Sequence, residues 1–183
     1  FDIRKDVLYC DDLNSKKRKE CIIVLNLILD CLIKWLAPIF VFTTEEIFSL
    51  VNKKNESIHE KNFVKIPSSW KDIKLNDKWK NLYKIKQEAN IAIEQKRANK
   101  EIGSSLEAEI EIFVSSDDYN LMEGLDLAEY FITSKATKVK NEKKEDGIKI
   151  VVKKSKGIKC PRCWKIIQSK CDRCDQVIKG AST

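Results

Sequence analysis

The longest apolar stretch of the chain has the spacing of a helix. Apolar side chains occupy most of a helix circumference between residues 15 and 35, and polar residues interrupt them at intervals of four, at Asn26, Asp30 and Lys34. Pro38 follows shortly, so the stretch is predicted to be an amphipathic helix and not a membrane span. Because so much of its circumference is apolar, we expect it to pack in a helical bundle, and to expose apolar surface where bundle partners are absent.

A short second helix is predicted to begin at Thr43. Thr43 is the expected N-cap, and Glu46 is placed to return a hydrogen bond to the Thr43 amide. Residues 53–75 have no sustained periodicity and are predicted to form a long connecting loop. This loop contains His59, the chain's single histidine, which we interpret as an exposed residue and not as a catalytic base.

A long basic helix is predicted over residues 76–101. Apolar residues recur at helical spacing along one side, and the basic residues lie mostly on the others. Gly103 is the expected C-cap of this helix. The apolar set consists of Trp79, Leu82, Ile85, Ala89 and Ile93.

Beyond this helix the apolar period becomes that of a strand. Apolar residues alternate over residues 106–114, which predicts a strand with one buried face. A pair of aspartates is expected to cap a short helix over residues 117–127. Residues 130–133 and 148–152 are predicted to be two further strands. These elements indicate a small α+β unit over residues 104–153.

Charge is distributed unevenly along the 183 residues. The chain carries 35 Lys and Arg against 28 Asp and Glu, a formal net charge of +7. Residues 101–130 hold nine acidic groups and no basic one, whereas residues 61–100 and residues 153–183 each have a net charge of +7. This pattern indicates two positive surfaces that face a polyanion, with the acidic stretch as a solvated face.

The residues in short supply exclude several kinds of active site. None of the five glycines is followed by Lys-Ser or Lys-Thr, so the chain has no phosphate-binding loop of that kind. One histidine cannot build a multi-histidine metal site, and no catalytic residue is predicted. The sequence begins at Phe1 without a secretory signal, so we expect a soluble piece of a longer protein whose catalysis lies upstream.

Four of the seven cysteines form the strongest motif. Cys160 and Cys163 make one Cys-x-x-Cys pair and Cys171 and Cys174 a second, with seven residues between the pairs. Two such knuckles can hold one Zn²⁺ tetrahedrally at about 2.3 Å from each thiolate, whereas disulfides or a redox pair are the alternatives. We predict a structural zinc ion with no open position for catalysis. The remaining cysteines are interpreted as buried thiols: Cys10, Cys21 and Cys31.

Basic residues and one tryptophan surround the predicted zinc site. Cations can hold phosphates, and an indole can stack on an unpaired base, so the module is suited to nucleic acid. Trp164 follows the second cysteine directly, and it can equally pack over the zinc site as a small core. The basic residues are Lys153, Lys154, Lys156, Lys159, Arg162, Lys165, Lys170, Arg173 and Lys179.

Four segments carry a family resemblance: FDIRKDVLY, LIKWLAPIFVFTTEEIF, EQKRANKEIGSSLEAEIEIF and GIKCPRCW. In this order, over essentially the whole chain, they resemble the C-terminal part of bacterial isoleucyl-tRNA synthetases, class I enzymes that join isoleucine to its tRNA. The synthetases for valine and leucine share the WLAPI-like helix end but not the terminal zinc module. The seven-residue spacer between the cysteine pairs is shorter than is usual in the family, so contacts made by a longer loop are not expected.

The resemblance implies an α+β chain in four parts. Residues 1–56 would end an anticodon-binding helical domain, residues 57–75 connect, residues 76–153 hold the long helix and a junction unit, and residues 154–183 form a zinc-binding module that contacts tRNA. The full-length enzyme is expected to be a cytoplasmic monomer whose ATP-dependent catalytic site and editing site lie outside this chain. The chain alone is therefore expected to be inactive.

The resemblance also places two residues of the KCPRCW motif, Arg162 and Trp164, near the anticodon of tRNA for isoleucine. Other basic residues are added as expected tRNA contacts: Lys159, Lys165, Arg173, Lys96, Arg97 and Lys100. A free-standing zinc-ribbon protein that binds DNA or RNA is the main alternative. A module that docks on another protein domain is a third.

Overall fold

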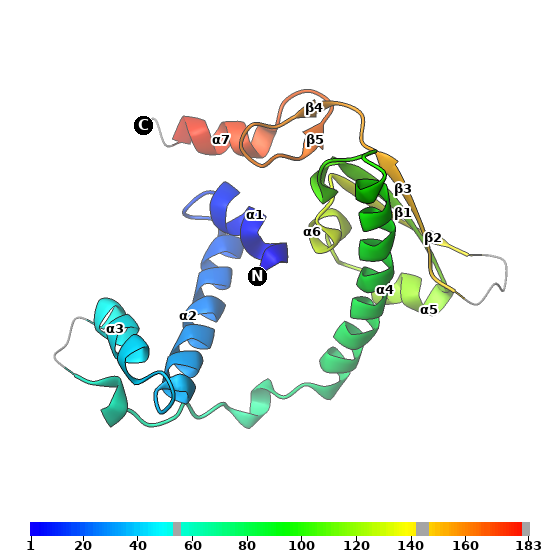
Figure 1. Cartoon of the computed structure of the whole chain (residues 1–183). Helices are drawn as coiled ribbons and strands as arrows, with labels where there is room; N and C mark the ends of the chain where they lie inside the picture. The colour runs from blue at the N-terminus through cyan, green and yellow to red at the C-terminus, as the bar shows by residue number, and fades with distance from the viewer. Residues whose placement is uncertain (53–55, 142–146, 181–183) are drawn as a thin grey trace. The chain divides into compact units, whose positions relative to one another are not determined.

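The computed structural model describes residues 1–52, 56–141 and 147–180. The chain forms two compact units, one of Leu13–Lys71 and one of Phe1–Asp12 together with Asp72–Thr183. Figure 1 labels their helices and strands. The first twelve residues therefore belong to the same unit as the cysteine-rich module, although nearly the whole chain separates them in sequence.

The smaller unit is built on two helices. α2 (Lys16–Leu36) is capped by Ser15, whose hydroxyl accepts a hydrogen bond from the helix's first turn at 3.4 Å. α3 (Val41–Val51) packs against α2. The helix predicted from the apolar spacing of residues 15–35 is thus confirmed. The small core of this unit consists of Ile33, Ala37, Phe48 and Ile58.

Two 3-10 turns follow within the same unit. η1 (Ile58–Glu60) packs against both helices, and η2 (Ser68–Trp70) lies further along the chain. His59 is exposed as predicted, although it belongs to η1 and not to an irregular loop. Its Nε2 atom lies 3.3 Å from the carbonyl oxygen of Val41, so it has a structural contact with the start of α3.

The N-cap of α3 lies three residues before the predicted one, and the predicted capping box is wrong. The N-cap is Phe40, and Thr43 lies inside the helix. The amide and the hydroxyl of Thr44 each donate to the Phe40 carbonyl at 2.9 Å, and the N-cap residue makes no side-chain capping bond. Glu46 does not act as the capping partner; its neighbour Glu45 instead accepts a hydrogen bond from the backbone of η1 at 2.9 Å.

Much of the apolar surface of α2 is exposed. This exposure is expected of a helix whose apolar circumference suits more neighbours than α3 and η1. No helix among the described ranges is both long enough and apolar enough to cross a membrane. The exposed apolar residues of α2 are Ile23, Val24, Leu27, Ile28, Leu32, Trp35 and Leu36.

The larger unit is built on a three-stranded sheet. The central strand β1 (Ala108–Val114) is parallel to β2 (Lys135–Lys140) and antiparallel to β3 (Lys149–Lys154). α4 (Ile73–Ala98) covers the sheet, as Figure 1 shows, and buries its apolar side against every second residue of β1. The predicted long helix, first strand and last strand are confirmed. The shared core includes Leu82, Ile85, Ala89, Ile93, Ala108, Ile110, Ile112 and Val114.

Short helices complete this unit. The helix predicted over residues 117–127 is in fact α5 (Ser116–Leu121), which Ser115 caps in place of the two aspartates. η3 (Ser105–Glu107) precedes β1, so β1 starts two residues later than the strand predicted over residues 106–114. α1 (Asp2–Cys10) packs against α6 (Leu127–Phe131).

α4 begins and ends three residues before its predicted limits. The Asp72 side chain caps its start by accepting the Leu75 amide at 2.9 Å. The predicted C-cap, Gly103, is wrong, because the helix ends at Asn99 and the chain turns at Lys100 with a φ of 58°. The Gly103 amide instead donates to a neighbouring carboxylate at 2.9 Å.

The strand predicted over residues 130–133 is wrong. Its first two residues lie in α6, where Asp126 accepts the Glu129 amide at 3.0 Å, and Ile132 ends the helix with a φ of 58°. The actual strand, β2, follows directly. β2 lies at the edge of the three-stranded sheet and pairs with β1. Three of its six residues are lysines, so it lacks the alternation of apolar and polar residues by which a strand is predicted.

Candidate metal centre and nucleic-acid surface

The four predicted ligands come together in a small module at the end of the chain, which we call the knuckle (residues 157–180). It contains the hairpin of β4 (Ile158–Lys159) and β5 (Ile166–Ile167), followed by α7 (Asp172–Gly180). The four sulfur atoms all lie within 4.8 Å of one another. They belong to Cys160, Cys163, Cys171 and Cys174.

The sulfur geometry fits a tetrahedral metal ion. The Sγ atoms of Cys163 and Cys171 are 3.8 Å apart, close to the edge of about 3.8 Å that a tetrahedron with metal–sulfur bonds of about 2.3 Å requires. Three of the four thiols are buried and the fourth is half-buried. The chain can therefore hold a metal ion here entirely through sulfur.

Local backbone bonds shape the first cysteine pair. The Trp164 amide donates to the Cys160 carbonyl at 3.0 Å, and the Cys160 amide donates to the Lys165 carbonyl at 2.9 Å. Gly157 allows the backbone before β4 to lie close to β5. Its φ is 138°, and a Cβ at this position would lie 2.2 Å from the Ile167 carbonyl oxygen. Only glycine fits such a position without displacing the hairpin.

The metal-free thiols differ in their protonation. Burial acts to raise the pKa of Cys160, but the backbone amides of Cys163 and Arg162 stabilise its thiolate and bring the pKa down to about 7. Burial raises the pKa of Cys171 to about 12, and burial also raises the pKa of Cys163. Because metal ligation requires thiolates, metal binding must release protons from these thiols.

The other three cysteines are not part of this set. Cys10 is buried as predicted and packs against the four cysteines, with its Sγ 3.7 Å from the Arg162 carbonyl oxygen. Burial raises its pKa to about 11, so it stays protonated at neutral pH. Cys21 and Cys31 lie in α2 and are half-buried, so the prediction that they are buried thiols holds only in part.

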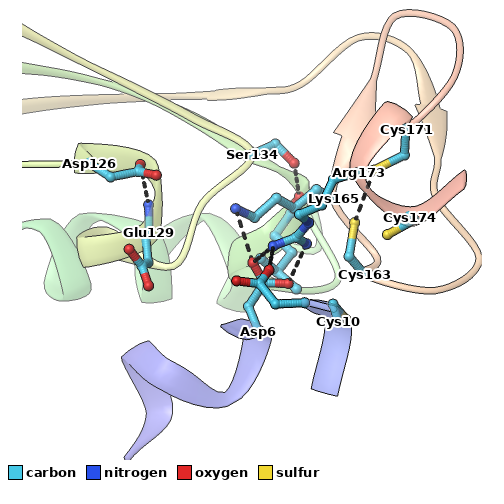
Figure 2. A network of polar contacts seen from close by, with 12 residues as sticks. Asp6, Cys10, Asp126, Glu129, Ser134, Cys163, Lys165, Cys171, Arg173 and Cys174 are labelled. Atoms are coloured by element: carbon cyan, nitrogen blue, oxygen red, sulfur yellow. Dashed lines mark hydrogen bonds and ion pairs between the residues drawn. The ribbon is translucent and has the colours of Figure 1, made fainter. Parts of the chain in front are cut away.

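An ion-pair network joins α1 to the knuckle, as Figure 2 shows. The carboxylate of Asp6 accepts two hydrogen bonds from the Arg173 guanidinium, at 2.7 and 2.8 Å, and lies 3.5 Å from the Lys165 ammonium. Arg173 also donates to Asp11 at 3.1 Å. Asp6 and Arg173 are 167 positions apart in sequence. No periodicity or motif pairs residues at that separation, and opposite charge was the only signal of this network.

The charges in the network are firmly held. Burial raises the pKa of the Asp6 carboxyl, but hydrogen bonds from Arg173 and the positive charges of Lys165 and Arg173 outweigh that effect and hold the pKa below its usual value. The hydrogen bond to Asp6 is also the main reason that the pKa of Arg173 is raised. Asp6 and Arg173 are therefore fully ionised at neutral pH.

The predicted tRNA contacts in the knuckle have two different environments. Arg162 donates to the Tyr9 carbonyl at 3.2 Å and to the Cys10 carbonyl, so with Lys165 and Arg173 it faces α1. Lys159 lies 3.7 Å from Glu107.

Trp164, the remaining predicted contact in the knuckle, is 60% exposed and is not one of the residues of the buried cysteine cluster.

The predicted contacts at the end of α4 form a separate group. Lys96 pairs with Glu101 at 2.8 Å, and Arg97 pairs with Glu94 at 2.6 Å. Arg97 and Lys100 line a hollow of about 300 Å³. Both cations of the ion pairs remain substantially exposed, so they can exchange these partners for phosphates.

A larger cavity opens beside Trp164. It has a volume of about 720 Å³ and lies within the larger unit, between α1, α6 and the knuckle. Its walls combine aromatic, apolar and charged side chains, which is the combination that surrounds an unstacked base in proteins that bind single-stranded nucleic acid. They include Ile3, Tyr9, Leu106, Ile132, Trp164 and Lys165.

Comparison with known proteins confirms the resemblance found in the sequence. The family model for the anticodon-binding domain of tRNA ligase matches residues 1–112. The chain is 51% identical over 173 residues to the isoleucine–tRNA ligase of Pelagibacter ubique (strain HTCC1062), covering 94% of this chain and 19% of that protein. It is 41% identical over 175 residues to the isoleucine–tRNA ligase of Agrobacterium fabrum (strain C58 / ATCC 33970), covering 91% and 18%. The chain thus spans about a fifth of the length of these curated relatives, and it belongs to the family of anticodon-binding domains of tRNA ligases.

Proposed function

We propose that the chain binds tRNA for isoleucine through the knuckle. The observation that carries the proposal is Trp164, which is 60% exposed on a hydrogen-bonded turn beside a cavity of about 720 Å³. An exposed indole in this setting is suited to stack on an unpaired base, and each such stack contributes about 1–3 kcal/mol. This favours stacking over the alternative that Trp164 covers the cysteine cluster.

The metal that fits the four cysteines best is zinc. Sulfur donors at tetrahedral positions suit Zn²⁺, and the donor set is closed, so the ion would supply folding energy and not catalysis. Cys160, Cys163, Cys171 and Cys174 would hold it. Its role would be to keep the knuckle folded, because the knuckle has little apolar core besides these cysteines.

The basic residues would add a sequence-independent attraction for the phosphate backbone. Lys96, Arg97, Lys100 and Lys159 are proposed to contact phosphates. Arg162, Lys165 and Arg173 bond to α1, so they are proposed to hold the knuckle against α1 and not to contact phosphates.

The relatives suggest the larger protein in which this chain acts. We propose that it is the tRNA-contacting part of an isoleucine–tRNA ligase that uses ATP, acts as a monomer in the cytoplasm, and carries its catalytic and editing sites elsewhere. In that protein residues 1–56 would end the anticodon-binding bundle, residues 57–75 connect, residues 76–153 form the junction, and residues 154–183 form the zinc module. The chain by itself would have no ligase activity.

Binding of tRNA to the zinc-loaded chain tests this function. Fluorescence anisotropy with labelled tRNA for isoleucine is expected to give tighter binding than with tRNA for valine or leucine, and an affinity that falls steeply as salt rises. Equal affinity for all tRNAs would reduce the chain to a general basic module. Tighter binding to duplex DNA than to any tRNA would favour the free-standing zinc-ribbon interpretation instead.

A further inference from the structure

Residues on both sides of Trp164 in the knuckle contact α1. Arg162, two positions before it, donates to the carbonyl groups at the C-terminal end of α1, one of them at 3.2 Å. Lys165, the next residue after it, lies 3.5 Å from the Asp6 carboxylate. The indole stands exposed between these two attachments. The direction in which the indole points therefore depends on the contacts between α1 and the turn of residues 160–165.

Asp6 supplies the ion-pair part of this docking: its carboxylate binds Lys165 and Arg173, whereas Arg162 bonds to backbone carbonyl groups of α1. The Asp6 side chain is only 20% exposed, and its two oxygen atoms accept the two Arg173 hydrogen bonds in a parallel, bidentate arrangement. Arg173 lies between the cysteines of the second pair, whereas Lys165 follows the first pair. One carboxylate from the start of the chain thus binds cations from both halves of the knuckle.

The knuckle also has a second anchor, to the sheet. The Ile166 amide donates to the Ser134 hydroxyl at 2.6 Å, and that hydroxyl lies 2.5 Å from the Leu106 carbonyl oxygen (Figure 2 labels Ser134). This anchor holds β5 but contacts neither Trp164 nor α7. Loss of the α1 attachments would therefore leave the hairpin in place while freeing the turn that carries the indole.

We propose that Asp6 is a positioning residue for tRNA recognition: it docks α1 on both halves of the knuckle and so sets the direction in which Trp164 meets the tRNA. The inference rests on the proposed function of the knuckle. Both oxygen atoms of the Asp6 carboxylate are engaged by Arg173, and Lys165 lies 3.5 Å away, so its role in this proposal is to hold the knuckle and not to bind the tRNA directly.

The sign of the effect separates this role from simple electrostatics. Asp6→Asn removes one negative charge, and a purely electrostatic surface would then bind tRNA more tightly. Positioning predicts the reverse, a loss of about tenfold in affinity for tRNA, because a partly buried pair is broken and the turn is released. Asp117→Asn removes the same charge from an exposed site at the start of α5, and it should leave affinity unchanged or slightly increased.

Arg173 completes the test as a double-mutant cycle. If Arg173 were a phosphate contact, Arg173→Gln would lower the slope of log affinity against log salt by about one, and its effect would add to that of Asp6→Asn. Positioning predicts that Arg173→Gln and Asp6→Asn each weaken binding with an unchanged salt slope. The double variant should then be no weaker than either single variant.

Two further measurements keep the inference open to refutation. Zinc content should remain one ion per chain in each variant, and amide hydrogen exchange should increase in α1 and around Trp164 but not in α4. If Asp6→Asn lost zinc, Asp6→Glu would take its place, because it keeps the charge but displaces the carboxylate, and it should still weaken tRNA binding. If the unmodified chain bound no tRNA, the proposed function would fail. The exchange measurement would still decide whether Asp6 holds the knuckle, and unchanged exchange would overturn the inference.

Discussion

Trp164 and Cys160 belong to one hydrogen-bonded turn, in which the Trp164 amide donates to the Cys160 carbonyl at 3.0 Å. The backbone that carries the ring proposed to stack on tRNA is thereby bonded to a proposed metal ligand. Loss of the metal should therefore change how the indole is presented, whereas removal of the ring leaves this backbone bond in place.

Removal of zinc should unfold the knuckle and leave the rest of the larger unit intact. The knuckle depends on its metal for a core, whereas α4 and the sheet share their own buried cluster, which includes Leu82 and Ile110. A strong chelator should therefore abolish preferential tRNA binding while most of the helical circular dichroism signal persists. Returning Zn²⁺ should restore binding, and tRNA binding that survives complete removal of zinc would contradict the proposed role of the knuckle.

Trp164→Ala should weaken tRNA binding by about fivefold to 150-fold, which corresponds to about 1–3 kcal/mol of stacking. Zinc content should not change, because Trp164 is 60% exposed and is not one of the buried residues of the cysteine cluster. Trp70→Ala is the matched control, since Trp70 is 61% exposed but lies in the smaller unit. Zinc loss in Trp164→Ala would show instead that the indole packs over the metal site.

Zinc affinity should increase with pH. Cys163 and Cys171 have raised pKa values, so both thiols carry protons at neutral pH in the metal-free chain, and zinc must displace these protons. Lowering the pH from 8 to 6 should thus weaken the apparent affinity, by at least about tenfold per pH unit. Competition against a chromophoric chelator measures this slope. Cys10→Ser should retain one zinc and the same slope, and a zinc affinity independent of pH would argue against thiolate ligands.

Gly157→Ala should destabilise the knuckle severely. The added methyl group would lie 2.2 Å from the Ile167 carbonyl oxygen, at a backbone φ of 138° that alanine rarely adopts. A cost of about 3 kcal/mol or more is expected, seen as weaker zinc retention and a lower melting temperature. Gly147→Ala is the control, because a Cβ there meets no atom within 4 Å. Equal melting of both variants would mean that the hairpin tolerates a shift at position 157.

Regular elements were predictable where one periodic signal dominated. α4 and β1 each bury one apolar side, and α2 is apolar around most of its circumference, so apolar spacing identified all three to within a few residues. The ends of the helices were less predictable, because caps depend on which neighbour supplies the bond. At α3 the N-cap is Phe40, without a side-chain capping bond, in place of the expected capping box at Thr43, and a left-handed Lys100 replaced Gly103 beyond α4.

β2 could not be predicted from local pattern. It is recognisable as a strand only through its parallel pairing with β1, in which Lys135 to Lys140 match Glu109 to Val114. Some of that pairing rests on charge, since Lys135 lies 2.6 Å from Glu109. A lysine-rich edge strand has no apolar alternation, and so its existence depends on the strand beside it.

The sequence by itself determined the four-cysteine set, the two basic stretches, the long helix and the family, because each of these depends on residues close together in the chain or on an order of motifs. Only the tertiary structure decided which cations are available to a partner. Arg162, Lys165 and Arg173 looked equivalent to the other basic residues of the module, yet all three bond to α1, more than 150 positions away. Pairing between side chains so far apart in sequence is set by the folded arrangement of the elements, and it cannot be predicted from local sequence.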